Sequence, residues 1–196
     1  DPVISSLSQT RRNFIAENML DLFFSEVFIW GEMQTDPHPG NYRIRLDEEE
    51  GDKIVLLDFG SVRLIENKFL QHLRNMIIAA YYDDRIALVD AVISSGLMQE
   101  AAPVETLNDF VNVLLGLVEP LNYRKRLSIN SDCIPDYAID NQFNYCWSSA
   151  NLPKRIGKQA LQSAASYYFS LPNAEFLLFS RKLAGVYAFI AAMDAR

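Results

Sequence analysis

The stretches MQTDPHPGN (residues 33–41) and VLLDFG (residues 55–60) determine how this chain is interpreted. In the first stretch, an Asp and an Asn stand five residues apart in a loop that two prolines and a glycine stiffen. In the second, Asp-Phe-Gly follows a run of aliphatic residues that is typical of a strand. Between them, YRIRL (42–46), the charged turn DEEEGD (47–52) and KIVLLDF (53–59) predict a β-hairpin.

The rest of the chain has the patterns of helices. Residues 9–31 repeat apolar side chains at a period near 3.6, and the second half of this segment is apolar almost all round, which predicts burial. Gly31 is predicted to be its C-cap. Further helices are expected over about 66–82, 84–95, 104–118, 154–168 and 173–193, with a stop at Glu119-Pro120, a separation at Pro172-Asn173 and an irregular segment over 121–153. The predicted fold class is mainly α (α+β), a helical body that carries one small β-hairpin.

Composition and charge narrow the function classes. The chain has 196 residues, 49% of them apolar, which suits one domain or a large part of one. Its net charge of −7 argues against nucleic-acid binding, which needs a basic face. The acidic run 47–52 is expected to be a solvated turn. The apolar run 176–193 contains Arg181 and Lys182 and is predicted to be a buried or half-buried helix rather than a membrane span.

Two cysteines, Cys133 and Cys146, lack the spacing of metal ligands. They are predicted to be two buried thiols in a reducing compartment, and a disulfide between them is the alternative.

Asp36, Asn41 and Asp58 carry the chemistry. The order D-x-x-x-x-N, hairpin, D-F-G matches the C-terminal lobe of protein kinases, where the first Asp orients the attacking group and the other two residues hold metal ions on the ATP phosphates. Mg²⁺ needs such hard oxygen ligands. The alternative is that all three residues merely cap turns. His38, inside the motif, is expected to make a hydrogen bond that stabilises the loop.

QTDPHPGN followed by VLLDFGSVR resembles the ABC1/ADCK/UbiB family of atypical protein-kinase-like proteins, also called the AarF or COQ8 group. The tail LPNAEFLLFSRKLAGVYAFIAAMDAR also resembles that family. The resemblance implies that residues 1–196 are a kinase-like C-terminal lobe, without the N-terminal lobe. It also implies a catalytic role for Asp36, metal ligation by Asn41 and Asp58, and a nucleotide site completed by Phe59 and Gly60.

The same resemblance implies ATP and Mg²⁺ as cofactors, with phosphoryl transfer or ATP hydrolysis that supports ubiquinone or other isoprenoid-quinone biosynthesis. It implies protein partners from that pathway and peripheral membrane association through parts outside this chain. The location would be a bacterial cytoplasm or the interior of a mitochondrion or plastid. Without an N-terminal lobe, the isolated fragment is expected to bind ATP poorly and to be inactive.

The segment after Gly60 indicates the phosphate acceptor. A helix is expected within about six residues and no Ala-Pro-Glu motif follows, so the platform on which protein kinases dock a peptide is missing. A small-molecule or lipid-related substrate is therefore expected. Two alternatives stay open: an aminoglycoside/choline-kinase-like small-molecule phosphotransferase, and a non-catalytic nucleotide-sensing scaffold.

Overall fold

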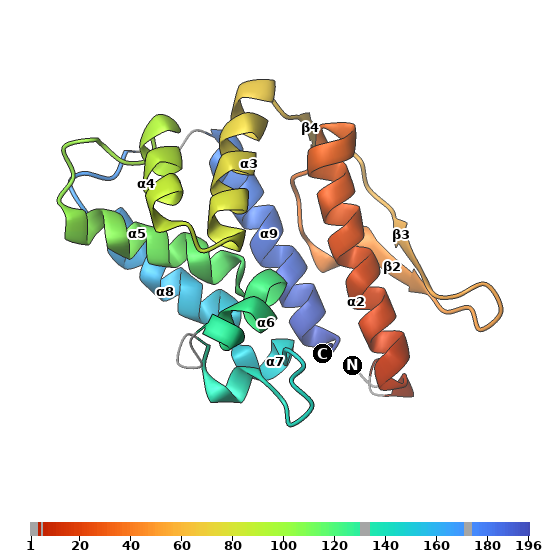
Figure 1. Cartoon of the computed structure of the whole chain (residues 1–196). Coiled ribbons are helices and arrows are strands. Elements are labelled where there is room, and N and C mark those ends of the chain that lie inside the picture. The colour runs from red at the N-terminus through yellow and green to blue at the C-terminus, as the bar shows by residue number, and fades with distance from the viewer. Residues whose placement is uncertain (1–3, 5, 130–133, 171–173) are drawn as a thin grey trace.

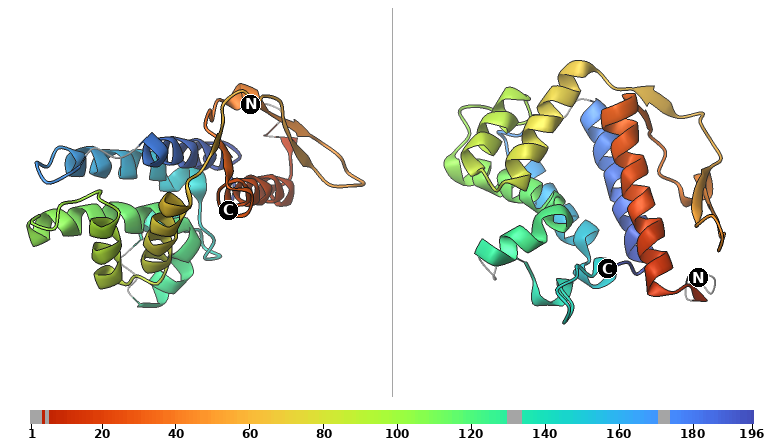
Figure 2. Two further views of the ribbon diagram at one scale, coloured as in Figure 1. Left: turned by 90° about the horizontal axis from the view of Figure 1, so that it is seen from above. Right: turned by 45° about the vertical axis from the view of Figure 1, so that its right-hand side comes forward.

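The computed structural model describes residue 4 and residues 6–129, 134–170 and 174–196. Two long helices, α2 (Gln9–Phe24) and α9 (Ala174–Ala192), lie side by side, and a β-hairpin lies on the outer side of α2 (Figures 1 and 2). On the other side of α9 are α3 (Asn67–Tyr81), α4 (Arg85–Ser94), α5 (Val104–Leu117), α6 (Glu119–Ile129), α7 (Trp147–Ala150) and α8 (Leu152–Ala164). The prediction of a mainly helical body is confirmed.

The first helix begins and ends where its sequence indicates. The Ser8 hydroxyl accepts a hydrogen bond from the Arg11 backbone N–H and caps the start of α2. After Phe24 the helix widens into the π-helical turn η1 (Ser25–Trp30), and it ends at Gly31, whose φ of 67° is left-handed, as predicted for the C-cap.

The predicted burial of the second half of this helix is partly wrong. Ile29 is 76% exposed and Trp30 is 58% exposed. The wider π turn places these two side chains off the buried stripe that Ala16, Met19 and Phe23 form on α2. Helical periodicity alone does not reveal such a change of pitch.

The structure has two small sheets rather than one hairpin. The predicted hairpin is present as β2 (Tyr42–Arg45) and β3 (Lys53–Leu56), with Tyr42 opposite Leu56. A second antiparallel pair, β1 (Glu32–Gln34) with β4 (Val62–Leu64), was not predicted, because strands of three residues carry no readable alternation. This second sheet places the segment that enters the 33–41 loop beside the segment that leaves Asp-Phe-Gly.

The acidic turn 47–52 is solvated only in part. Glu48, Glu49 and Glu50 are exposed as expected, but Asp52 is buried, and its carboxylate pairs with the Arg11 guanidinium at 2.6 and 2.9 Å. The hydrogen bond from Arg11 holds the pKa of Asp52 below its usual value. This contact fastens the far end of the hairpin to α2.

The middle of the chain is more helical than predicted. Helix α5 ends at Leu117, as predicted for a stop at Glu119-Pro120, but a further helix follows directly, since the chain turns at Val118 and α6 starts at Glu119. Pro120 is tolerated there because N–H groups in the first turn of a helix have no partner within the helix. The segment 121–153 is thus only partly irregular, since it also contains α7 and the 3₁₀ turn η4 (Asp136–Ala138). The Cys133 thiol and the predicted separation at Pro172-Asn173 lie outside the described residues. Cys146 is a half-buried free thiol.

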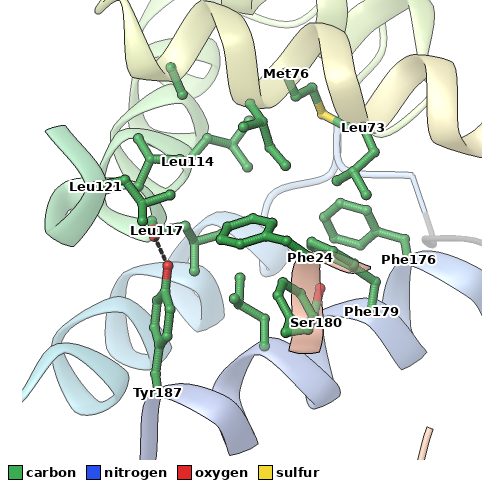
Figure 3. Close-up of a pocket in the computed structure, with 15 residues that line it drawn as sticks. Phe24, Leu73, Met76, Leu114, Leu117, Leu121, Phe176, Phe179, Ser180 and Tyr187 are labelled. Carbon is green, nitrogen blue, oxygen red and sulfur yellow. Dashed lines mark hydrogen bonds between the residues drawn. The ribbon is translucent and has the colours of Figure 1, made fainter. Parts of the chain in front are cut away.

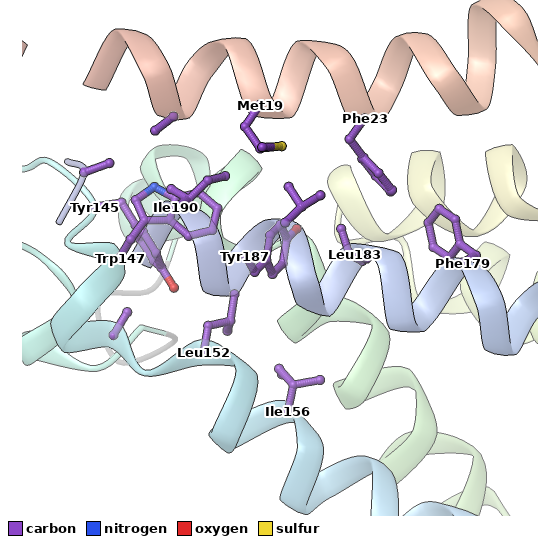
Figure 4. Packing of buried hydrophobic residues seen from close by; sticks show 14 of the residues in the cluster. Met19, Phe23, Tyr145, Trp147, Leu152, Ile156, Phe179, Leu183, Tyr187 and Ile190 are labelled. Atoms are coloured by element: carbon purple, nitrogen blue, oxygen red, sulfur yellow. The ribbon is translucent and has the colours of Figure 1, made fainter. Parts of the chain in front are cut away.

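The core centres on α9 (Figure 4). Helix α9 contributes the buried residues Leu183, Tyr187 and Ile190. They pack in one cluster with Met19 and Phe23 of α2 on one side and with Leu152 and Ile156 of α8 on the other. The prediction that 176–193 forms a buried or half-buried helix is therefore confirmed. In the described part of the chain, no helix combines the length and the apolar character that crossing a bilayer would require.

Candidate functional site

The loop between β1 and β2 is anchored at its start by Gln34 and Thr35. The buried Gln34 side chain donates a hydrogen bond to the Asp58 carbonyl oxygen at 2.5 Å and accepts one from the Asp36 backbone N–H at 3.2 Å. The Thr35 N–H and hydroxyl both donate to the Ser61 carbonyl oxygen, at 3.0 and 2.8 Å. One amide side chain therefore links the backbones of the two aspartates.

Asp36 and Asn41 are in direct contact. The Asn41 side-chain amide donates to the Asp36 carboxylate Oδ2 at 3.0 Å and lies 3.2 Å from the Asp36 carbonyl oxygen. The five-residue spacing is thus closed into a tight loop, and the Asn41 carbonyl oxygen accepts the Leu57 N–H at 3.0 Å. The structure brings these two predicted residues together beside the strand that leads to Asp58.

Asp58 lies at the exposed end of the strand segment. Its Oδ1 accepts the Gly60 backbone N–H at 2.7 Å, and a Cβ at Gly60 would lie 3.1 Å from the same oxygen. Glycine at this position therefore lets the Asp58 carboxylate fold back onto the chain. Phe59 is 63% exposed. Among the described contacts, the Asp-Phe-Gly segment is linked to Asp36 by the Gln34 side chain, which bonds to the backbones of both Asp58 and Asp36.

Helix α9 packs against the 33–41 loop and contacts it through Arg181 and Gly185. The Arg181 guanidinium lies 3.3 Å from the Asp36 Oδ1, in an ion pair whose side chains are 62% and 38% exposed. One turn further on, a Cβ at Gly185 would lie 2.3 Å from the Pro37 Cβ, so only glycine permits this approach of loop and helix. Neither residue was predicted to belong to the site. The only signal for them in the sequence is a basic residue and a glycine inside an apolar run.

His38 has the structural role that was predicted for it. Its Nδ1 accepts the Gly40 backbone N–H at 3.0 Å and caps the 3₁₀ turn η2 (Pro39–Asn41). A Cβ at Gly40 would lie 2.8 Å from that nitrogen, so the glycine and the histidine depend on each other.

The donor atoms suit a magnesium ion. Both contacts of the Asn41 amide nitrogen are to Asp36, so its Oδ1 is the atom left for a ligand, and the Asp58 Oδ2 makes no hydrogen bond within the described part of the chain. Both are hard oxygens, and Mg²⁺ usually takes one or two carboxylates and completes its shell with phosphate and water. Among the described residues, no cluster of three His, Cys, Asp or Glu side chains is placed to hold a metal alone. The fit is therefore to a metal that arrives with a phosphate.

An apolar pocket elsewhere in the fold is a poor candidate for a ligand site. It lies between α2, α3, α5, α6 and α9, and none of its lining residues belongs to the 33–41 loop or to Asp-Phe-Gly (Figure 3). Its hydroxyl group at Tyr187 already donates to the Leu117 carbonyl oxygen at 2.6 Å. The cavity volume of about 50 Å³ is far below the several hundred Å³ of typical ligand sites. We regard it as a packing gap.

Comparisons with known proteins agree with the motif. Residues 3–92 match the ABC1 atypical kinase-like domain. Over 190 residues, 95% of this chain, it is 25% identical to the mitochondrial atypical kinase coq-8 of Caenorhabditis elegans, of which it covers 22%. It is 31% identical to the mitochondrial atypical kinase COQ8 of Saccharomyces cerevisiae over 58% of this chain and 22% of that protein. It is 33% identical to the AarF domain-containing kinase 1 of Drosophila melanogaster over 43% of this chain and 17% of that protein. The chain thus spans about a fifth of the length of these relatives.

Proposed function

Because residues 3–92 place this chain in the ABC1 atypical kinase-like family, we propose that it forms the C-terminal lobe of a kinase or ATPase that uses Mg·ATP. The observation that carries the proposal is the closed loop in which Asn41 holds Asp36, joined through Gln34 to Asp58. Family membership implies the use of ATP. The oxygen ligands at Asn41 and Asp58 support Mg²⁺ as the accompanying metal.

Each residue has a distinct proposed role. The Asp36 carboxylate, fixed by Asn41 on one oxygen and Arg181 on the other, would orient a hydroxyl or a water and accept its proton. The Asn41 and Asp58 oxygens would hold Mg²⁺, which when bound neutralises charge on the phosphate oxygens. Phe59 and Gly60 would line the nucleotide site. Gly60 also lets the Asp58 carboxylate keep its conformation.

The proposed acceptor is a small molecule or a lipid-related compound. Only the short strand β4 stands between Gly60 and the start of α3 at Asn67, so this part of the chain offers no long segment on which a peptide could dock. ATP hydrolysis without an acceptor is compatible with the same site.

The biological setting follows from the relatives. Two of them are mitochondrial atypical kinases, and the resemblance to the COQ8 group suggests support of ubiquinone or another isoprenoid-quinone biosynthesis, with partners from that pathway. A mitochondrial interior or another reducing compartment is therefore the proposed location, with membrane association supplied by other parts of the protein. The family match favours this function over the aminoglycoside/choline-kinase alternative.

A thermal-shift experiment on the full-length gene product tests the proposal. ATP with Mg²⁺ should raise the melting temperature, because a ligand at about one hundred times its Kd adds about 2.7 kcal/mol of stability. Asp58→Asn should abolish the shift, since Asn retains the hydrogen bond from Gly60 but loses the charge. A suitable control is Asp140→Asn, because Asp140 also accepts backbone N–H groups in a turn, at Gln142 and Asn144.

The outcomes distinguish a Mg·ATP-binding enzyme from a non-catalytic scaffold. A Mg²⁺-dependent shift that survives in the control and disappears in Asp58→Asn supports a nucleotide site at Asp-Phe-Gly. The absence of any shift in the unaltered protein would refute the proposal and favour a scaffold that has kept only the architecture.

A further inference from the structure

A buried ion pair lies beneath the 33–41 loop. Glu26, in the π-helical turn, and Lys182, on α9, are 2.8 Å apart, and their side chains are only 4% and 1% exposed. Charged groups are rarely buried so completely unless they are paired and hydrogen-bonded. Burial raises the pKa of the Glu26 carboxyl, while Lys182 and the Gln34 backbone N–H act in the opposite direction.

Each member of the pair acts on one end of the loop. The backbone N–H of Gln34, two residues before Asp36, lowers the pKa of the Glu26 carboxyl. The Lys182 ammonium donates to the hydroxyl of Tyr42 at 3.0 Å and lies 5.6 Å from the centre of its ring. Tyr42 is itself buried and directly follows Asn41. The ion pair therefore spans the whole D-x-x-x-x-N segment from below.

We propose that Glu26, Lys182 and Tyr42 form a positioning network that sets the separation of Asp36 and Asn41 for the metal and the nucleotide. None of the three is expected to touch substrate or metal. They act indirectly, through Gln34 at the start of the loop and through Tyr42, the residue that follows Asn41. The catalytic consequence rests on the proposed function, whereas the structural consequence, order in the loop, can be measured without it.

A second ion pair, between a buried carboxylate and a guanidinium side chain that is 25% exposed, provides the comparison. Glu119 is only 3% exposed. Its carboxylate pairs with the Arg155 guanidinium and accepts a hydrogen bond from the Tyr145 hydroxyl at 2.7 Å. Its partners belong to α8 and to the segment before α7. Within the described residues, Arg155 forms its hydrogen bonds with Glu119 and the Ala150 carbonyl oxygen rather than with the 33–42 segment. A change at Arg155 should therefore weaken the fold without altering the loop.

The experiment compares three changes in the full-length gene product with this control. Lys182→Met removes one charge, the double variant Glu26→Gln with Lys182→Met removes both, and Tyr42→Phe removes only the hydrogen bond to the loop end. Arg155→Met is the control. For each, hydrogen exchange of the 33–42 segment is measured by mass spectrometry, together with the Mg²⁺ concentration that gives half of the thermal shift with ATP.

Loss of the network should raise the half-saturating Mg²⁺ concentration roughly tenfold, as is typical when a group that supports metal ligands is removed. It should also speed exchange in the 33–42 segment, with Tyr42→Phe giving the smaller effect and the least loss of melting temperature. Arg155→Met should lower the melting temperature and leave both quantities unchanged. If Lys182→Met does not fold, the double variant and Tyr42→Phe decide the matter.

Unchanged exchange and unchanged Mg²⁺ dependence in folded network variants would overturn the inference and leave the pair a stabilising contact only. The same conclusion would follow if Arg155→Met loosened the loop equally. If the unaltered protein shows no response to nucleotide, the proposed function fails, and the exchange of the 33–42 segment alone then supports or refutes the positioning network.

Discussion

Replacing Gly185 by alanine should damage the candidate site more than the fold. Gly185 lies within α9, where it faces Pro37 of the loop that carries Asp36. A Cβ built at this position would lie 2.3 Å from the Pro37 Cβ and 3.1 Å from its Cγ. Because the Pro37 ring is rigid and its backbone is part of the loop, the contact cannot be relieved by a side-chain rotation.

The size of the effect follows from these distances. Ordinary contacts begin at 3.4 Å, so the loop must retreat from α9 by about 1 Å. Overpacking of this kind costs about 1–3 kcal/mol, and the higher helix propensity of alanine offsets about 1 kcal/mol of that cost. Stability should therefore fall by at most about 2 kcal/mol. A displacement of about 1 Å near reacting groups can lower the rate about a hundredfold.

The assay measures melting temperature, Mg²⁺-dependent ATP binding and ATP hydrolysis on the full-length gene product. The matched control is Gly157→Ala at an exposed position of α8. A Cβ there would meet nothing within 4 Å, so alanine should stabilise the helix by about 1 kcal/mol. The reasoning is refuted if Gly185→Ala behaves like the control, with a stability gain and intact nucleotide binding.

Three further predictions concern the surroundings of the loop. Arg181→Gln should change the free energy of unfolding by less than about 1 kcal/mol, because the ion pair with Asp36 is exposed, but it should weaken Mg·ATP binding. An equal loss of free energy in Mg·ATP binding, measured by titration, and in folding, measured by melting, would contradict this. The lowered pKa of Asp52 adds stability that is fully present above its unfolded pKa of about 3.9 and is lost as pH falls through the lower folded pKa. Asp52→Asn should therefore flatten the acid side of the stability–pH curve measured by denaturant unfolding. An unchanged acid side would show that the pairing of Asp52 with Arg11 adds no stability there. Gly31→Ala should cost about 1–2 kcal/mol in thermal unfolding because φ is 67° there, and a neutral result would argue against the left-handed cap.

Sequence patterns located most of the elements. The hairpin, the helices at 67–81 and 85–94, and the long final helix fall within a few residues of their predicted positions. These segments are long and strongly periodic, and their ends carry local signals such as Asp84, whose side chain accepts the Ala87 N–H. Local chemistry is sufficient for such elements because their signals lie within one or two turns of chain.

Two of the errors depend on contacts between distant segments, and a third arises from a local signal with two meanings. Strands β1 and β4 are three residues each and exist because the hairpin brings their ends together. Asp52 looked like part of a solvated turn, but its partner Arg11 is 41 residues away. Pro120 looked like a helix stop, although a proline in the first turn can equally begin a helix.

The candidate site shows the same division between local and distant information. Asp36, Asn41 and Asp58 were recognised from short motifs, whereas Arg181, Lys182 and Gly185 were visible only as two charges and a glycine inside an apolar run. These three α9 residues lie within one turn of each other, on the face of the helix that meets the loop, so one helix supplies an ion pair, a buried anchor and a close approach. The family match ends at residue 92, well before this helix. The matched region contains the 33–41 loop but not the α9 residues that contact the loop, so the structural unit that bears the proposed chemistry extends to α9.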